Sequence, residues 1–193
     1  MKKEKAAENS AVKDNRKTRY TKRALRESLI ELMESKSILR ITIKDICDLA
    51  DISRSTFYTH YDDQYDLLRQ IEEETISYFE EVLKKYDRKR SKRGIIEMIE
   101  EILQYIICNS NSIQVLMSEN GDIDFQKKFV SRFLHHLQVV NYLTVKAVED
   151  PKLREYYAVY IINGAMALMQ HWIKNNMNIP VPIMAKMLLH LTQ

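Results

Sequence analysis

The chain has 193 residues and a formal net charge of +3, with 45% hydrophobic and 30% charged residues. This composition is ordinary for a globular protein and allows one substantial core, or a small domain beside a larger one. The sequence contains no repeat and no low-complexity tract. Gly and Pro number only three each, so residues that interrupt helices are rare. We therefore expect an all-α fold.

The charge is spread unevenly along the chain. The first 23 residues hold nine Lys or Arg against three Asp or Glu, a net charge of +6, so the remaining 170 residues sum to −3. A basic segment suits a polyanionic partner, although a solvated terminal tail has the same composition. We expect residues 1–17 to form a basic flexible arm.

Cysteine usage and hydropathy favour a reduced, cytoplasmic protein. Cys47 and Cys108 lie outside any CxxC or Cys/His pattern, and Cys47 falls on an apolar helix face, which predicts a buried thiol. The first ten residues lack the apolar region of a signal peptide. Residues 156–173 carry no formal charge, but Asn163, Gln170 and three tyrosines are costly in lipid. We therefore expect no membrane span.

The spacing of apolar residues predicts four helices before residue 84. They cover Thr21–Glu34, Ile43–Ala50, a segment from Ser53 to about Tyr61, and a longer helix that starts at the sequence DDQ. Thr42 and Ser53 have the chemistry of N-caps for the second and third helices. The inward face of the fourth helix is predicted to carry Leu68, Ile71, Thr75, Phe79 and Val82.

A charged stretch, Lys84–Gly94, is the predicted hinge and domain boundary, because seven of its eleven residues are Lys or Arg. Helical patterns then resume. They cover Ile95–Cys108, Ile113–Met117, Phe125–Val148 and Lys152–Met177, followed by a last helix that starts around Pro180 and Pro182 and runs through Leu191.

The segment ADISRSTFYTHY, residues 50–61, separates two kinds of side chain. Phe57 and Tyr61 share one helix face, where they can pack onto the first two helices. The opposite face and the first turn carry Arg54, Ser55, Thr56, Tyr58 and Thr59. Small hydroxyls allow close approach to DNA, Arg can grip guanine O6 and N7, and helix N-termini at Thr42 and Ser53 attract phosphates. This pattern predicts a helix-turn-helix that enters a major groove.

Residues 42–68, TIKDICDLADISRSTFYTHYDDQYDLL, resemble the DNA-binding domain of the TetR family of bacterial transcriptional regulators. The positions that match the family pattern are Thr42, Ile46, Ala50, Ser53, Thr56, Phe57, Tyr58, His60, Tyr61 and Leu67. The resemblance covers about residues 18–70. It implies phosphate contacts for Thr42, Thr56, Tyr58 and His60, with Lys44 well placed to add one, and base contacts for Arg54, Ser55 and Thr59.

Two positions depart from the family pattern. Asp51 replaces the glycine of the turn, and Asp adopts a left-handed conformation less readily than Gly. Gln64 replaces a phosphate-binding lysine, which removes one charged group from the DNA-binding surface.

Residues 154–180, REYYAVYIINGAMALMQHWIKNNMNIP, resemble the C-terminal domain of Firmicutes-type regulators related to those of dihydroxyacetone kinase operons. In the family, the last two helices form a four-helix interface between two subunits, and Gly164 beside Ala165 permits close approach of helices. The resemblance implies a homodimer. The interface residues we expect are Gly164, Ala165, Leu168, Trp172, Met184 and Leu188.

The remaining polar and aromatic residues are candidates for an effector site, a metal site or a catalytic site. An effector cavity between helices is predicted to use Tyr105, Tyr142, Tyr157, Tyr160, Asn163 and His171. His135 and His136 are adjacent and splay around a helix, so we expect no metal site. The sequence has no Gly-rich phosphate loop, GxSxG motif or nucleophile beside a base, so we expect neither an enzyme nor a cofactor.

The sequence therefore predicts an all-α, homodimeric regulator of the TetR type with two domains. A three-helix helix-turn-helix domain spans residues 18–70, with its motif at about 42–61, and a connecting helix and basic hinge follow over 71–93. Residues 94–193 form the effector-binding and dimerisation domain. We expect a repressor that binds a pseudo-palindromic DNA operator and is released by a small-molecule effector. An activator, or a regulator whose C-terminal domain is controlled by a partner protein, is the alternative.

Overall fold

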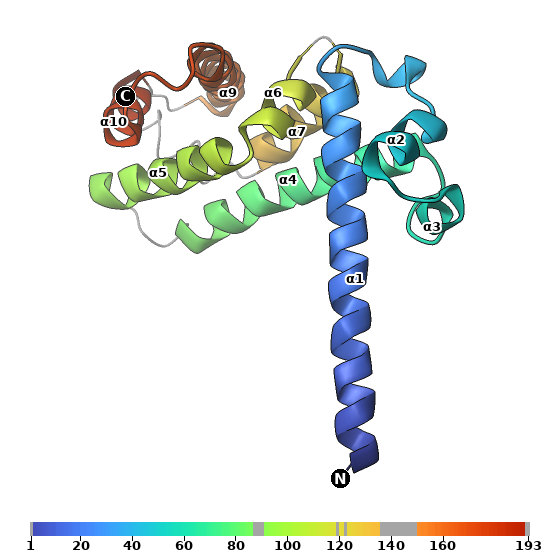
Figure 1. Cartoon of the computed structure of the whole chain (residues 1–193). Coiled ribbons are helices and arrows are strands. Elements are labelled where there is room, and N and C mark those ends of the chain that lie inside the picture. Colours follow the sequence, from blue (N-terminus) through green and yellow to red (C-terminus); the bar gives the residue numbers. More distant parts are fainter. Residues whose placement is uncertain (1, 87–90, 119, 122, 136–149, 192–193) are drawn as a thin grey trace. The chain divides into compact units, whose positions relative to one another are not determined.

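The computed structural model of the chain describes residues 2–86, 91–118, 120–121, 123–135 and 150–191 (Figure 1). Every regular element within these ranges is a helix, so the predicted all-α fold is confirmed. The chain divides into two compact units, Met1–Ile71 (unit 1) and Glu72–Gln193 (unit 2). The division falls inside one helix, α4 (Gln64–Tyr86), and precedes the charged stretch that the sequence indicates as the boundary.

Unit 1 is built around the packing of α1 on α2 and of α2 on α3. Its elements are α1 (Lys2–Met33), the 3-10 turn η1 (Ile38–Arg40), α2 (Ile43–Ala50), α3 (Arg54–Tyr58) and the first turns of α4. The side chains that fill its core are Leu25, Leu29, Met33, Ile41, Ile46, Phe57 and Leu67. The predicted α2 bounds are confirmed. The third helix ends earlier than expected, at Tyr58, and continues as a turn.

The first helix is much longer than the predicted Thr21–Glu34, because it begins at Lys2. Residues 2–20 contain no Gly or Pro and many Lys, Glu and Ala, so no local signal ends the helix within them. The residues expected to form a flexible arm are therefore helical in the structure. In Figure 1 the N-terminal half of α1 extends beyond the other helices of unit 1. Among residues 16–33 of α1, the buried positions begin at Thr21 and end at Met33.

The part of α4 that belongs to unit 2 presents the inward face predicted from the sequence, since Thr75, Phe79 and Val82 are buried. The ring of Phe79 packs edge-on against Phe129, with centroids 5.4 Å apart. Near its end, α4 is tied to α5 by a shared carboxylate. Glu101 accepts a hydrogen bond from the Tyr86 hydroxyl at 2.9 Å and pairs with Lys85 at 2.7 Å.

Unit 2 continues with five further described helices, α5 (Lys92–Cys108), α6 (Ser110–Leu116), α7 (Ile123–His135), α9 (Pro151–Lys174) and α10 (Val181–Leu191). α10 packs on α5, and α9 packs on both α6 and α7. The helix predicted over residues 125–148 corresponds at its start to α7, and its residues 136–148 lie outside the described ranges.

The end of α6 is a junction of three helices. The side-chain amides of Gln126 on α7 and Gln170 on α9 both donate to the carbonyl oxygen of Met117, at 3.2 and 3.0 Å. The loop that follows passes close to this carbonyl end. A Cβ at Gly121 would lie 2.7 Å from the carbonyl oxygens of both Val115 and Leu116. Because those oxygens belong to the backbone, they cannot move aside without disturbing α6.

We predict that Gly121→Ala lowers the free energy of unfolding of unit 2 by about 1–3 kcal/mol, the usual cost of forcing extra atoms into a packed site. Denaturant unfolding followed by helical circular dichroism measures the change. Gln114→Ala, at an exposed position of α6, is the control and is expected to change stability by less than about 0.5 kcal/mol. A Gly121→Ala variant as stable as the parent chain would contradict the close approach of this loop to α6.

Candidate nucleic-acid interface

The entry to α2 is fixed by a reciprocal pair of hydrogen bonds between Thr42 and Asp45. The Thr42 hydroxyl accepts from the backbone N–H of Asp45 at 3.1 Å, and the Asp45 carboxylate accepts from the backbone N–H of Thr42 at 2.9 Å. The Thr42 hydroxyl also donates to that carboxylate, at 2.7 Å. These bonds from Thr42 lower the pKa of Asp45, so the cap stays ionised at neutral pH.

The turn between α2 and α3 rests on one residue in a left-handed conformation. Asp51 has φ 53° and ψ 45°, the region that the family's glycine would occupy without cost. The backbone N–H groups of Asp51 and Ile52 both donate to the carbonyl of Cys47, the latter at 3.0 Å. This pairing ends α2 and sets the direction in which α3 begins.

An aromatic base holds α3 against the rest of unit 1. Phe57 and Tyr61 are buried, as predicted, and their ring centroids lie 5.7 Å apart. The ammonium group of Lys22 on α1 lies 5.9 Å from the Tyr61 ring centroid, within the range of a cation–π contact. Cys47 on α2 is also buried. Burial raises the pKa of its thiol, so the thiol remains protonated at neutral pH.

The motif also carries three long exposed side chains that can donate hydrogen bonds. Arg54 is exposed in the first turn of α3, and Lys44 is exposed in the first turn of α2. Tyr58 keeps 58% of its surface exposed while its ring meets the Phe57 ring edge-on, with centroids 5.7 Å apart. An arginine, a lysine and a phenol on one compact segment match the donors that proteins offer to base edges and phosphates.

Most hydroxyl groups of residues 53–59 already have hydrogen-bond partners among the same residues. Ser53 caps α3 by accepting from the backbone N–H of Thr56 at 3.2 Å, and its oxygen lies 2.9 Å from the hydroxyls of both Ser55 and Thr56. The Thr59 hydroxyl donates to the carbonyl of Thr56 at 2.6 Å. His60 is half-buried, with its ring edge-on to Tyr61. These contacts shape the segment. The hydroxyls of Ser53, Ser55 and Thr56 share two O···O hydrogen bonds, so one of their three hydrogens stays available to donate to DNA.

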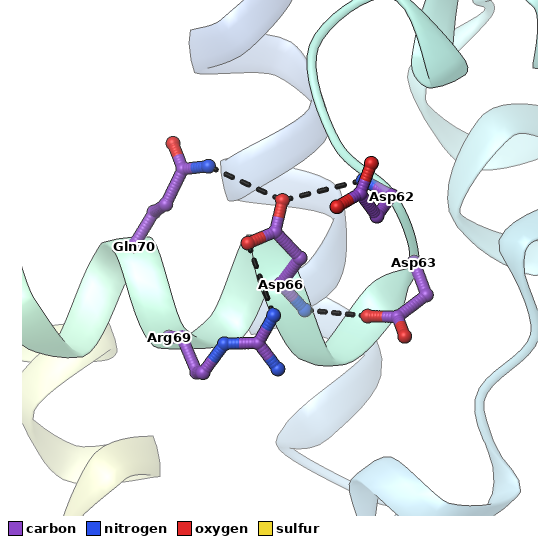
Figure 2. Close-up of polar contacts among 5 residues, drawn as sticks. All are labelled: Asp62, Asp63, Asp66, Arg69 and Gln70. Carbon is purple, nitrogen blue, oxygen red and sulfur yellow. Dashed lines mark hydrogen bonds and ion pairs between the residues drawn. The ribbon is translucent and has the colours of Figure 1, made fainter.

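The start of α4 is acidic, and it follows directly in sequence on residues 54–61, which we call the recognition segment. Figure 2 shows the Asp66 carboxylate at the centre of a local network. It accepts from the backbone N–H of Asp62 at 3.2 Å, from Arg69 at 3.1 Å and from Gln70 at 3.3 Å. The Asp63 carboxylate caps the helix by accepting from the Asp66 N–H at 2.6 Å. Gln64, where the family carries lysine, is the first residue of this helix.

The structure describes five of the six residues predicted to line an effector cavity. Tyr105 stacks on Tyr78, with ring centroids 3.9 Å apart, while Tyr157, Tyr160, Asn163 and His171 are exposed on α9. Tyr142 lies outside the described residues. The described part of unit 2 instead contains an open groove of about 470 Å³, lined by Glu73, Ile76, Lys127, Lys128, Ser131 and Arg132. Sequence reasoning named none of these residues.

Ion pairs cross this groove between α4 and α7. Arg132 pairs with Glu73 and, at 3.1 Å, with Glu80, and Lys128 lies 3.7 Å from the buried carboxylate of Glu72. The two members of each pair are far apart in sequence, which is why periodicity along one helix could not reveal them. Within the described residues, no three His, Cys, Asp or Glu side chains converge as metal ligands do.

Three of the residues expected at a dimer interface belong to the core of unit 2. Trp172, Met184 and Leu188 are buried within the chain, and the Trp172 indole donates to the carbonyl of Ile179 at 2.9 Å. Large apolar residues at helical spacing fit an internal core and an interface equally well, so their place in a dimer interface stays a prediction. Leu168 and Ala165 are half-buried, and Gly164 is exposed.

The exposed face of α9 combines residues that the sequence analysis assigned to an effector cavity or a dimer interface with residues that it assigned to no site. Side chains at helical spacing on this face are Leu153, Tyr156, Tyr157, Tyr160, Asn163, Gly164, Ala167 and His171. Tyr156 and Tyr160 keep 76% and 74% of their surfaces exposed. A Cβ at Gly164 would meet nothing within 4 Å in the chain itself. No described helix is long and apolar enough to cross a membrane.

The short α2 and α3, joined at Asp51 and braced by α1, form a helix-turn-helix unit followed by a helical C-terminal unit. Residues 93–193, more than half of the chain, match a TetR family model described as "Transcriptional regulator C-terminal region". The chain belongs to the TetR family of transcriptional regulators. A comparison with curated proteins found no match.

Solved structures share this fold over nearly their whole length. A TetR transcriptional regulator from Streptococcus agalactiae is 24% identical with a TM-score of 0.66, over 95% of this chain and 99% of that one. NalD of Pseudomonas aeruginosa, described as the secondary repressor of the MexAB-OprM multidrug efflux pump, is 14% identical with a TM-score of 0.67, covering 91% and 96%. The dihydroxyacetone kinase operon activator DhaS is a weaker likeness, 20% identical with a TM-score of 0.54 over 89% and 93%.

We predict that Asp51→Gly raises the free energy of unfolding of unit 1 by roughly 0.5–1 kcal/mol. Glycine relieves the left-handed strain, worth about 1–2 kcal/mol for a residue with a Cβ, while adding entropy to the unfolded chain. Asp51→Ala keeps the Cβ and therefore the left-handed strain, and alanine adopts this conformation less readily than aspartate, so the variant is expected to be less stable. Thermal unfolding of both variants gives the comparison, and a less stable glycine variant would show that the Asp51 side chain outweighs the backbone strain.

Proposed function

We propose that the protein is a homodimeric transcriptional repressor that binds a pseudo-palindromic DNA operator and is released by an effector. The observation that carries the DNA-binding part is the division of residues 54–61 into a buried aromatic base and an exposed arginine and tyrosine. Such a segment presents long donors outward on a rigid support. In a two-fold symmetric dimer, the recognition segment of each subunit would contact one half of the operator.

The exposed residues divide into base readers and phosphate binders. Arg54 has the reach and the planar donor pair to recognise guanine, so we assign it base reading. Lys44 and Tyr58 are assigned phosphate contacts, because a lysine is a compact charge and a phenol is a single donor. Ser55 and Thr59 remain candidate base contacts. We also keep as candidate phosphate contacts Thr42, Ser53, Thr56 and His60.

The exposed face of α9 supports the homodimer. α9 is apolar on both sides, since one face packs in the core of unit 2 and the other carries exposed tyrosines and Leu153. A helix of this kind is normally covered on both faces. Gly164 is exposed within that face, so a second helix could approach the α9 backbone closely there. We propose that a second copy of the chain covers this face.

Effector control would act through α4. The division between the units falls within α4, and the aromatic contact of Phe79 with Phe129 and the ion pairs of Arg132 hold this helix to α7. A ligand that favours one arrangement of α4 and α7 over another would shift the equilibrium between DNA-binding and released forms. NalD is described as a repressor, which agrees with the sign of regulation that we propose.

Two observations favour the alternative function, an activator or a regulator that a partner protein controls. The related structure DhaS is described as an operon activator. In addition, the described groove of unit 2 is open and largely charged, whereas the face of α9 is apolar. A partner protein on that face, rather than a small molecule in a cavity, would then control the chain. The DNA site that the purified protein selects from a random pool can be placed before a reporter gene. A fall in reporter expression would indicate repression, and a rise would indicate activation.

We predict that Arg54→Ala lowers the affinity for the preferred duplex. At the base pair that Arg54 contacts, it is also expected to reduce the difference in binding free energy between the preferred duplex and a duplex with that base pair changed, by about 1–3 kcal/mol. Tyr58→Phe, which removes only the hydroxyl, is expected to weaken all duplexes equally. Fluorescence anisotropy on a panel of mismatched duplexes at constant salt measures both. An Arg54→Ala variant that lost affinity uniformly would contradict the assignment of base reading to Arg54.

We predict that Tyr160→Asp converts the protein from dimer to monomer, because it places a charge in the apolar face that the second copy would cover. Tyr20→Asp is a matched control, since Tyr20 on α1 and Tyr160 both keep 74% of their surfaces exposed. Sedimentation equilibrium gives the mass of each variant. A Tyr160→Asp protein that remained a dimer with unchanged affinity between subunits would place the interface elsewhere.

A further inference from the structure

The DNA-facing side of unit 1 combines an acidic and a basic region, and only the basic one can bind phosphates. At the start of α4, Gln64 provides no charge, and the neighbouring Asp62, Asp63 and Asp66 are carboxylates. Arg69, the nearest cation along α4, pairs with Asp66 at 3.1 Å. A DNA strand that passed this turn would therefore meet net negative charge where the family pattern provides a lysine.

The opposite balance occurs on α1. Residues 16–23, RKTRYTKR, contain five cations and no acidic residue, and we call them the basic segment of α1. Arg16, Lys17 and Arg19 are exposed, and Tyr20 beside them keeps 74% of its surface exposed. Residues 1–15 add four more Lys against three acidic residues. The chain thus gathers its positive charge on the helix that braces the recognition segment.

Geometry ties the basic segment to the recognition segment. Lys22 lies 5.9 Å from the ring centroid of Tyr61, the residue that supports α3, and α1 packs directly on α2. Both segments belong to the same compact unit, unit 1. Figure 1 shows α1 continuing past α2 and α3 as a single helix. The exposed cations of residues 16–19 lie just before the part of α1 that is buried in the core, which begins at Thr21.

We infer that the basic segment of α1 is a second DNA-binding surface, which binds the phosphate backbone and supplies the positive charge that Gln64 does not. This inference rests on the proposed DNA-binding function. Arg16, Lys17 and Arg19 bind phosphates without reading bases, and each neutralised phosphate releases condensed counterions. Binding through this surface therefore depends steeply on salt and adds affinity to every duplex alike.

DNA fits this surface better than an anionic membrane does. A membrane-binding helix places large apolar side chains beside its cations, so that they enter the lipid. Among the described residues 16–20, Tyr20 is the one large exposed aromatic, and the other four are polar or charged. The attachment of the segment to the recognition unit, through Lys22 and Tyr61, also places it where a bound duplex would run.

The test is the triple variant Arg16→Gln/Lys17→Gln/Arg19→Gln in the full chain. Its affinity is measured against salt concentration for the selected operator and for an unrelated duplex. We expect both affinities to fall by the same factor, with the preference for the operator retained. The slope of log affinity against log salt is expected to decrease by about 0.9 for each phosphate that the variant no longer neutralises. Unchanged thermal unfolding, monitored in parallel, shows that the variant is folded.

Two further variants make the result specific. Lys84→Gln/Lys92→Gln/Lys174→Gln removes the same charge from exposed positions of unit 2 and is expected to leave the salt slope unchanged. Gln64→Lys restores the family's lysine and is expected to recover part of the affinity that the α1 triple variant loses. Recovery would show that a positive charge at position 64 and the cations of the basic segment contribute to the same DNA affinity.

The outcomes separate this inference from the function on which it rests. If the parent chain selects no operator, the proposed function fails and this inference with it. If the parent chain binds its operator and the α1 triple variant keeps the same affinity and salt slope, the inference alone is overturned. The last measurement is the binding of the parent chain and the triple variant to vesicles of phosphatidylglycerol and phosphatidylcholine. Binding of the parent chain to them, abolished in the triple variant while DNA binding is retained, would assign the segment to a membrane and overturn the inference.

Discussion

The left-handed turn at Asp51 is the constraint on which the DNA-binding unit depends. Two backbone N–H groups converge there on the carbonyl of Cys47, so α2 must end and α3 must start in one fixed direction. Only with that direction set do Phe57 and Tyr61 face the core while Arg54 and Tyr58 face outward. The family satisfies this constraint with glycine. This chain satisfies it with an aspartate, at some cost in backbone strain.

Electrostatic asymmetry is the second organising feature. The recognition segment carries long donors, the start of α4 carries a network of carboxylates, and α1 carries the exposed cations Arg16, Lys17 and Arg19. In unit 2, charges serve a different purpose, since Arg132 and Lys128 join α7 to the acidic face of α4. The same helix therefore has an acidic start beside the recognition segment and an ion-paired face in the C-terminal unit, which makes it the natural element through which an effector would act.

Local sequence signals predicted the helix-turn-helix well, because caps and short apolar periods involve residues close together in the chain. Thr42, Ser53, Phe57 and Tyr61 all take their expected structural places. The start of α1 was missed because no residue stops the helix. Trp172, Met184 and Leu188 are buried within the chain, and their place in a dimer interface stays a prediction. The groove of unit 2 could not be predicted, since its ion pairs join helices far apart in sequence.

The most direct test of this account is the selection of bound duplexes from a random pool by the purified protein, at near-physiological salt. Salt at this level suppresses binding through phosphates alone. The account predicts enrichment of one two-fold symmetric site, because two copies joined through α9 would present two recognition segments to one duplex. Enrichment of an asymmetric site would contradict the proposed dimer, and no enrichment at all would contradict the assignment of residues 42–61 to sequence-specific DNA binding.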